Sequence, residues 1–365
     1  MNLHNPKIYF REKDITEKKK HLLDHGKLSV ISFRYPNDIA GLEIINTKGK
    51  ITHLPFQGQR IWDVEFNGRR LDMRSPVRQP NPNRDFLMNL GGFFFHCGMS
   101  AMGSPGPHDL HPIHGELVNA PYQTAFLESG EDEKGKYVVV GGDYEHAVAF
   151  GHHYLAQPTI KLYEHQSLIY LSMRVINLQN SPMEYMYLAH INFRPVNNGR
   201  FVYSAIYDAQ HIRVRTAFPG FMKPSNGMKE TMRKFAEDPT LHHVIRPEYT
   251  FDPEIVFMID YEQDDDGWAH AMHIHPDGTA DYVTHKPSQL DKGIRWISRT
   301  PDLEALGMEA GTAGTEGYTM EKAKGNVKLL GVGEEFICEI VAGVLDEGET
   351  KKMEEKIRQY GKAKK

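Results

Sequence analysis

Hydrophobic and polar residues alternate along much of the chain, in short segments separated by turn sequences. The segments at 27–35, 40–56 and 60–73 show this pattern and contain the hairpin-type turns NTKGK and FNGRR, where glycine supplies the positive φ that such turns require. A period of two places successive side chains on opposite faces of a strand, so the pattern predicts half-buried β-strands. We expect further strands at 136–146, 159–165, 168–178, 184–193, 254–261, 267–275, 280–286, 326–332 and 334–345.

Helical patterns are few, and we expect them at about residues 12–24, 227–237 and 350–360. Many short strands with few helices predict an all-β fold, a large antiparallel β-sandwich that forms a single domain over residues 1–365. About 1–26 and 350–365 are expected to be peripheral helical or frayed ends. The irregular stretch at about 75–115 is longer than most connections in compact domains, and loops of that length are usually functional.

Composition narrows the classes of function. Among 365 residues, 25% are charged and 40% hydrophobic, which is ordinary for a soluble globular protein. The net charge of -5, with no basic patch beyond the chain ends, argues against nucleic-acid binding. Two cysteines, Cys97 and Cys338, suggest a reducing compartment, and no apolar run reaches the length of a membrane span. We therefore expect a soluble cytoplasmic protein with no membrane or nucleic-acid partner.

Histidines gather in the irregular stretch, in the sequence PGPHDLHPIHGEL at 105–117. It holds His108, His111 and His114, and His96 lies just upstream. Such a cluster could bind a metal, contact a ligand through hydrogen bonds, or form a polar loop. Pro107 and Pro112 prevent a helix from stacking the rings on one face, although an extended loop could still join His96 and His114. We expect no metal here. Outside this loop, the alternating HAMHIH at 270–275 is interpreted as a polar sheet face, and Trp62, Trp268 and Trp296 as core residues.

Four stretches in order resemble the galactose mutarotase-like (aldose 1-epimerase) superfamily: IHGELVNAPYQ, VINLQNSPMEYMYLAHINF, FDPEIVFMIDY and LGMEAGTAGTEGYTMEKAKGNVKLLGVGEE. In that superfamily a His-Gly strand, a later strand with a second histidine, an Asp-bearing segment and a late glutamate surround a sugar site. The segments LPFQGQRIWDVEFNGRRLDM, NLGGFFFHCGMSAMGSPG and DDDGWAHAMHIHPDG are similar to an uncharacterised branch of it. The resemblance covers about residues 27–345 and implies the superfamily's large antiparallel sandwich.

The resemblance also implies roles for individual residues. Glu309 would be the catalytic base and His190 the acid, on opposite sides of a sugar-sized space. His114 would bind the ring oxygen or a neighbouring hydroxyl, and Asp252 would bind sugar hydroxyls in the same pocket. The superfamily's arginine before the His-Gly strand is missing, so Arg74 is a candidate substitute, and His96 is a further candidate for substrate binding. The implied chemistry uses proton transfers and requires no cofactor.

The sequence leaves three functions open. The leading one is an isomerase that interconverts the anomers of a sugar. A second is a related sugar epimerase or lyase, and a third is a non-catalytic carbohydrate-binding protein on the same fold. The partner is expected to be a small sugar, neutral or weakly anionic because the arginine is missing, and the chain a monomer or homodimer.

Overall fold

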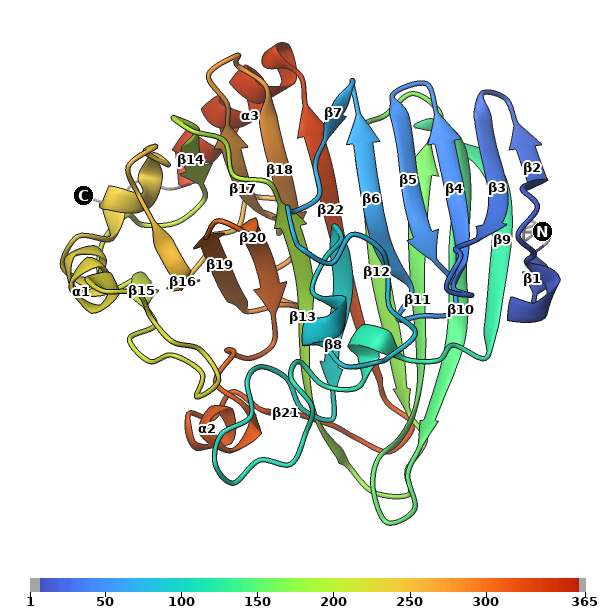
Figure 1. The fold of residues 1–365 in the computed structure, drawn as a ribbon, viewed down its shortest axis with the longest axis horizontal. Coiled ribbons are helices and arrows are strands. Elements are labelled where there is room, and N and C mark those ends of the chain that lie inside the picture. Colours follow the sequence, from blue (N-terminus) through green and yellow to red (C-terminus); the bar gives the residue numbers. More distant parts are fainter. Residues whose placement is uncertain (1–6, 361–365) are drawn as a thin grey trace.

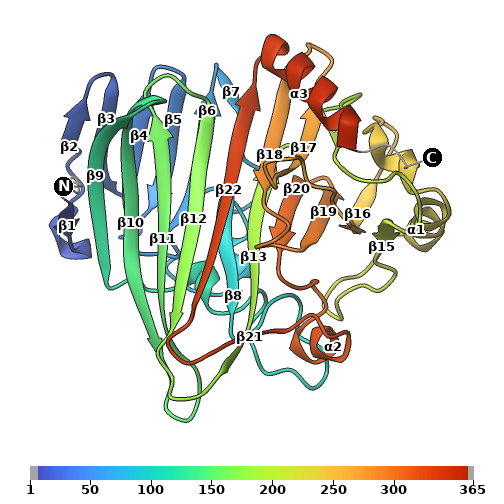
Figure 2. The same cartoon turned by 180° about the vertical axis from the view of Figure 1, so that it is seen from behind.

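The computed structural model describes residues 7–360, which form two antiparallel sheets stacked face to face (Figure 1, Figure 2). The first sheet has nine strands in these residues. In spatial order they are β1 (Ile8–Phe10), β9 (Thr124–Asp132), β10 (Gly135–Ala147), β11 (His153–Tyr163), β12 (Leu168–Asn177), β22 (Glu335–Leu345), β18 (Ala280–His285), β17 (Ala269–Ile274) and β14 (Arg200–Tyr203).

The second sheet has thirteen strands within the same residues. Its main path runs through β15 (Ile212–Val214), β16 (Phe251–Ile259), β19 (Lys292–Arg299), β20 (Glu304–Gly311), β13 (Met183–Phe193), β8 (Phe94–Met99), β6 (Arg60–Phe66), β5 (Gly49–Leu54), β4 (Ala40–Asn46), β3 (Leu28–Arg34) and β2 (Lys20–His25). Off this path, β7 (Arg69–Arg70) pairs with β6 and β21 (Lys328–Leu330) pairs with β13. The predicted large antiparallel sandwich is confirmed.

Strict alternation marks the strands that have one face in the core. In β11 and β12 nearly every second side chain is buried, and these chains pack between the two sheets. The hydrophobic effect drives this packing, and it fixes the register of the strands because a slip of one residue would expose the apolar face. The alternating segments predicted from the sequence are therefore strands for a simple physical reason.

Three α-helices occur in the described residues: α1 (Met228–Glu237), α2 (Tyr318–Ala323) and α3 (Glu347–Tyr360). The helices predicted near 227–237 and 350–360 are confirmed, and α2 was not predicted. The prediction of a helix at 12–24 is wrong, since a 3₁₀ turn at Glu12–Asp14 is followed by strand β2. Pairing of β2 with β3, with Leu23 packed against the core, outweighs the helix propensity of this charged segment. None of the described helices is long and apolar enough to cross a membrane.

The middle of the thirteen-stranded sheet is buried on both faces. In β13, β8 and β20 nearly every residue is buried, because one face packs on the other sheet and the second lies under loops. Residues of this second face, among them Phe95 and Leu188, form a separate hydrophobic cluster. The stretch at 75–115, expected to be irregular throughout, contains β8 and otherwise covers this outer face. The site lies here.

Candidate functional site

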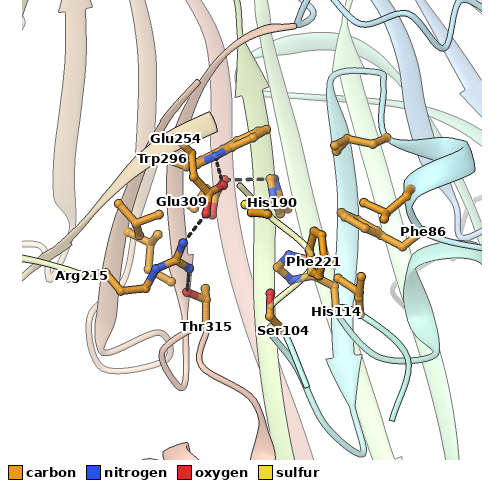
Figure 3. Close-up of a pocket in the computed structure, with 16 residues that line it drawn as sticks. Phe86, Ser104, His114, His190, Arg215, Phe221, Glu254, Trp296, Glu309 and Thr315 are labelled. Carbon is orange, nitrogen blue, oxygen red and sulfur yellow. Dashed lines mark hydrogen bonds and ion pairs between the residues drawn. The ribbon is translucent and has the colours of Figure 1, made fainter. Parts of the chain in front are cut away.

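A pocket of about 540 Å³, part of it open to solvent, lies on the outer face of the thirteen-stranded sheet. Its floor comes from strands β13, β16, β19 and β20, and its rim from the segments at 86–90, 104–114 and 215–222. The labelled side chains in Figure 3 are Phe86, Ser104, His114, His190, Arg215, Phe221, Glu254, Trp296, Glu309 and Thr315.

His190 and Glu309 meet at the floor of this pocket. They lie on the neighbouring strands β13 and β20, and His190 Nδ1 is 3.0 Å from Glu309 Oε1. Both side chains are almost completely buried, and the contact lacks the angles of a well-aligned hydrogen bond. Burial raises the pKa of Glu309, His190 partly offsets this, and the charge of Glu254 raises it further. The prediction that the two residues flank a sugar-sized space from opposite sides is wrong, since they touch.

Glu254 on β16 forms the second carboxylate of the pocket. Trp296 Nε1 donates a 2.7 Å hydrogen bond to Glu254 Oε2, and Arg215 Nη2 donates to Glu254 Oε1 (Figure 3). Arg215 Nη1 also lies 3.4 Å from Thr315 Oγ1, while Arg215 Nε has no hydrogen-bond partner among residues 7–360. Glu254 and Trp296 are therefore held rigidly, and the cation that lines the pocket is Arg215, whereas the sequence offered Arg74.

His114 reaches the pocket from a tight turn. Its φ is +60°, its backbone N–H donates to Gly103 O at 2.9 Å, and its own carbonyl accepts from Gly98 N–H at 2.9 Å. Gly115 follows with φ +79°, and a Cβ there would lie 2.2 Å from Ala101 O, so only glycine fits. The His-Gly pair thus forms a turn, and the expectation that it opens a strand is wrong.

The His114 ring packs between other rings of the site. Ring centroids lie 4.8 Å from Phe86 and 5.2 Å from His190. Burial lowers the pKa of His114 well below its ordinary value, and His190 and Arg215 lower it further. His114 is therefore a neutral imidazole, and its buried Nδ1 has no hydrogen-bond partner among the described residues.

Comparisons with known proteins agree with this architecture. The family described as domain of unknown function (DUF4432) matches residues 39–344. The chain belongs to the DUF4432 family. A search of curated proteins finds no significant match.

Solved structures share the fold of this DUF4432 chain. A Klebsiella pneumoniae protein named "putative aldose 1-epimerase" is 17% identical with a TM-score of 0.81, covering 99% of this chain and 97% of its own. A galactose mutarotase-like protein from Clostridium acetobutylicum is 12% identical with a TM-score of 0.57, covering 88% of this chain and 100% of its own. At such identities the likeness establishes the galactose mutarotase-like fold and no activity.

Two residues predicted to bind substrate lie outside the pocket of the DUF4432 chain. Asp252 stands two residues before Glu254 at the start of β16, a step of about 7 Å along a strand. Glu254 therefore lines the pocket and Asp252 does not. Arg74 pairs with Glu304 at 3.0 Å and donates to Pro301 O, so it is bound to a surface turn. Neither residue lines the pocket that holds His190 and Glu309.

His96 also does not line the pocket. On β8 its neighbours Phe95 and Cys97 face the pocket side, whereas His96 points between the sheets, where Tyr187 OH lies 2.6 Å from its Nδ1. Burial lowers the pKa of His96 to about 3, so its ring is neutral. Strand parity explains the result, because adjacent residues face opposite sides of the sheet.

The two remaining loop histidines lie outside the pocket, and α2 contacts one of them. His108 is exposed, and His111 Nε2 accepts from the backbone N–H of Tyr318 at 3.3 Å. Asp109 accepts from the N–H of Thr319 at 3.0 Å, which ties the loop to the start of this helix. The loop therefore delivers His114 to the pocket and uses its neighbours as anchors.

The carboxylate of Glu116 also anchors this loop. This carboxylate accepts from the N–H of Ser100 at 2.9 Å, from the Ser100 hydroxyl at 2.7 Å and from Tyr154 OH at 2.7 Å. Burial alone would raise the pKa of Glu116, but these hydrogen bonds outweigh burial and lower it. The buried carboxylate therefore fixes the loop to both sheets.

One group of potential metal ligands stands out in the described residues, and it lies away from the pocket. His273, His275 and Asp281 place ligand atoms within 4.8 Å of one another between the sheets. Asp281 is already engaged, because Arg69 Nη2 donates to its Oδ1 at 2.6 Å. The guanidinium charge beside this carboxylate disfavours a divalent cation there. The loop histidines form no such group.

Among the pocket residues that sequence reasoning missed are Glu254, Trp296 and Arg215. Glu254 carries a signal, since a charged residue in phase with the buried Val256 marks a carboxylate on a covered face. Trp296 lies within a run of buried residues in β19, so its sequence context cannot be distinguished from that of an ordinary core tryptophan. Arg215 directly follows the short strand β15 and gives no signal, because its position depends on how that strand pairs with β16.

Proposed function

We propose that the chain is an aldose 1-epimerase-like isomerase, which interconverts the α and β anomers of a sugar by proton transfer. The observation that carries the proposal is the contact of His190 and Glu309, 3.0 Å apart and buried at the floor of a pocket. A buried carboxylate beside an imidazole is a typical acid–base arrangement. The galactose mutarotase-like fold supports this choice of reaction.

Anomer exchange needs a base and an acid near one carbon atom. The base removes the proton of the anomeric hydroxyl while the acid protonates the ring oxygen, and the C1–O5 bond breaks to give the open-chain aldehyde. Rotation about C1–C2 presents the other face of the carbonyl, and the reverse transfers close the ring. Because both oxygens are bonded to C1, an acid and a base that lie side by side can serve both.

Glu309 is assigned as the base and His190 as the acid. The raised pKa of Glu309 makes it a stronger base than an exposed carboxylate, since proton transfer is most effective when the pKa approaches the working pH. His190 Nδ1 lies 3.0 Å from the same carboxylate, and the reverse transfers that close the ring return both residues to their starting protonation.

His114 and Arg215 are assigned to binding. Neutral His114 has its Nδ1 without a partner among the described residues, so it can contact the ring oxygen or a neighbouring hydroxyl. Arg215 Nε is likewise available for a sugar hydroxyl, while its Nη atoms hold Glu254 and Thr315. These two residues take over the hydroxyl binding that the sequence assigned to Asp252 and Arg74.

The test is NMR measurement of α/β exchange across a panel of aldoses, with and without EDTA. We expect accelerated exchange for at least one sugar and no loss on chelation, because the mechanism uses only proton transfers. Binding without accelerated exchange would favour the non-catalytic carbohydrate-binding function. Product with a changed configuration at another carbon, or an unsaturated product, would favour the epimerase or lyase.

A further inference from the structure

The walls of the pocket differ sharply in chemistry. One side carries the polar groups of Glu254, Glu309, Arg215 and Thr315 (Figure 3). Apart from Ser104 and His114, the rest of the rim is apolar, and its side chains come from the covering loops: Phe86, Leu87, Leu90, Ile113, Phe221 and Met222. A ligand in this space therefore meets polar atoms along one edge and carbon along the other.

Few of the polar groups are free to bind hydroxyls. Glu254 is occupied by Arg215 and Trp296. Among the residues that line the pocket, the buried atoms without a well-aligned partner in residues 7–360 are His190 Nδ1, His114 Nδ1, Glu309 Oε1 and Arg215 Nε. These atoms belong to the side chains around Glu309 and His190, where the anomeric centre is placed. A hexose carries hydroxyls around its whole ring, so those on the far side would meet apolar groups and lose their hydrogen bonds to water.

The position of His114 indicates which substituent meets the apolar wall. The first of the two contacts proposed for His114 is the ring oxygen, and the His114 ring packs on Phe86 with centroids 4.8 Å apart. The ring oxygen is bonded to C1 and C5. With C1 at Glu309, C5 and its exocyclic carbon therefore point toward the side of Phe86. A methyl group suits this wall, whereas a hydroxymethyl group would bury an unpaired hydroxyl.

We propose that the substrate is a 6-deoxyhexose, bound with its methyl group against the apolar wall formed by Phe86, Leu87, Leu90, Ile113, Phe221 and Met222. This inference rests on the proposed anomer exchange and names the substrate class of the same site. A hydrophobic pocket discriminates against an added hydroxyl by at most about 100-fold. We therefore expect kcat/KM for the deoxy sugar to exceed that for the parent hexose by roughly 10- to 100-fold.

The experiment uses matched pairs of sugars that differ only in the C6 hydroxyl: L-fucose with L-galactose, D-fucose with D-galactose, and L-rhamnose with L-mannose. Anomer exchange is measured by NMR with the full chain. The preferred pair should show the 10- to 100-fold advantage of its deoxy member. Equal or faster exchange of the parent hexose in every pair would overturn the substrate class and leave the isomerase function intact.

A variant tests whether the wall causes the preference. Phe221 is 47% exposed, so the Phe221→Ser protein should fold normally. The ratio of kcat/KM for the deoxy sugar to that for the parent hexose, expected to be roughly 10- to 100-fold in the wild type, should fall at least threefold in this variant. Phe150 is fully exposed and does not line the pocket, so Phe150→Ser is the matched control with an unchanged ratio. An unchanged ratio in both variants would contradict the assignment of the wall.

A second measurement separates the inference from the proposed function. Saturation-transfer NMR reports which ligand protons lie against the protein and does not depend on turnover. We expect the strongest saturation at the C6 methyl protons. If no sugar shows exchange, the isomerase function fails. The methyl signal then still decides the ligand class: strong saturation supports a deoxy sugar, and saturation confined to the protons near C1 overturns it.

Discussion

Two buried histidine–carboxylate contacts in this molecule have the same length but differ in the charged groups around the carboxylate. His190 and Glu309 lie 3.0 Å apart in the pocket, and His275 Nε2 and Asp281 Oδ2 lie 3.0 Å apart between the sheets. Asp281 has an arginine on its other oxygen, since Arg69 donates to Oδ1 at 2.6 Å. Within residues 7–360 no arginine or lysine pairs with Glu309, and a second carboxylate, Glu254, lies nearby.

The surroundings shift the two carboxyl pKa values in opposite directions. Burial alone would raise the pKa of Asp281, but Arg69, His273 and His275 outweigh burial and lower it. Burial raises the pKa of Glu309, and His190 does not fully offset it. A satisfied pair of this kind stabilises a fold, whereas an unsatisfied one that lines a pocket is poised for proton transfer. The comparison therefore teaches that distance alone does not identify a catalytic pair.

The largest effect is expected from Glu309→Gln. The amide keeps the shape of the side chain but cannot accept a proton, so anomer exchange should fall by roughly 10²–10⁴-fold. Sugar binding should change little, because the amide still pairs with a hydroxyl. Exchange NMR and calorimetry on the same preparation check both. Unchanged exchange would place the base on another residue, with Glu254 the first candidate because it lines the same pocket.

Asp281→Asn should instead damage the fold. It leaves Arg69 without its buried anion, and breaking a buried pair from one side costs about 3–5 kcal/mol of the free energy of unfolding. Urea unfolding followed by fluorescence measures this loss. Exchange activity of the remaining folded protein should stay near that of the wild type. A stable Asp281→Asn protein with reduced exchange would contradict the assignment of Asp281 to stability and of Glu309 to proton transfer.

The pH dependence of stability should separate the pairs further. Asp281 has a lowered pKa, so its contribution is present above the ordinary value of 3.8 and is lost as pH falls below it. Glu309 has a raised pKa, so the wild type loses stability as pH rises above 4.5 toward the folded value. Glu309→Gln should therefore be more stable than the wild type at pH 8 and equal below pH 4. Urea midpoints of both proteins measured from pH 3 to 8 check this, and a Glu309→Gln protein that is less stable than the wild type at pH 8 would contradict it.

The sequence predicted the fold well because alternation directly reports one-sided burial, as in β11 and β12. Two-sided burial did not always hide a strand, since β13 was predicted at 184–193, but it did so at β8. The strand β8 is buried on both faces and its FFHCGM sequence has no alternation, so it was assigned to a loop. The helix predicted at 12–24 failed for another reason, since edge pairing of β2 outweighed local propensity.

Only the site residues that belong to recognisable sequence motifs could be predicted. His114, His190 and Glu309 converge in the structure, although the sequence separates His114 and Glu309 by almost two hundred residues. Asp252 was chosen over Glu254 because a motif does not say how far along a strand the pocket extends. Arg215 was missed because only the pairing of β15 with β16 brings it to the pocket.

A smaller effect is expected from His114→Asn. Asparagine tolerates the φ of +60° at this turn, so the backbone should keep its conformation. Loss of the ring removes a contact made in both the ground state and the transition state, so KM should rise and kcat/KM should fall by about tenfold, with kcat nearly unchanged. Steady-state exchange kinetics give both constants. A fall in kcat alone, with KM unchanged, would move His114 into the proton-transfer machinery.

The smallest effect is expected from Arg74→Ala, which tests a residue that the sequence offered as a sugar ligand. Arg74 is 43% exposed at its side chain and pairs with Glu304 on a surface turn. Exposed pairs of this kind contribute about 0–1 kcal/mol, because water screens the charges and two long side chains lose entropy. The urea midpoint should therefore shift slightly, and KM and kcat should match those of the wild type. Arg215→Ala is the contrasting variant, since it removes the cation that lines the pocket and leaves Glu254 with an unpaired buried charge. If Arg74→Ala raised KM as much as Arg215→Ala, the sugar would have to reach the surface turn at 300–304, which lies outside the pocket.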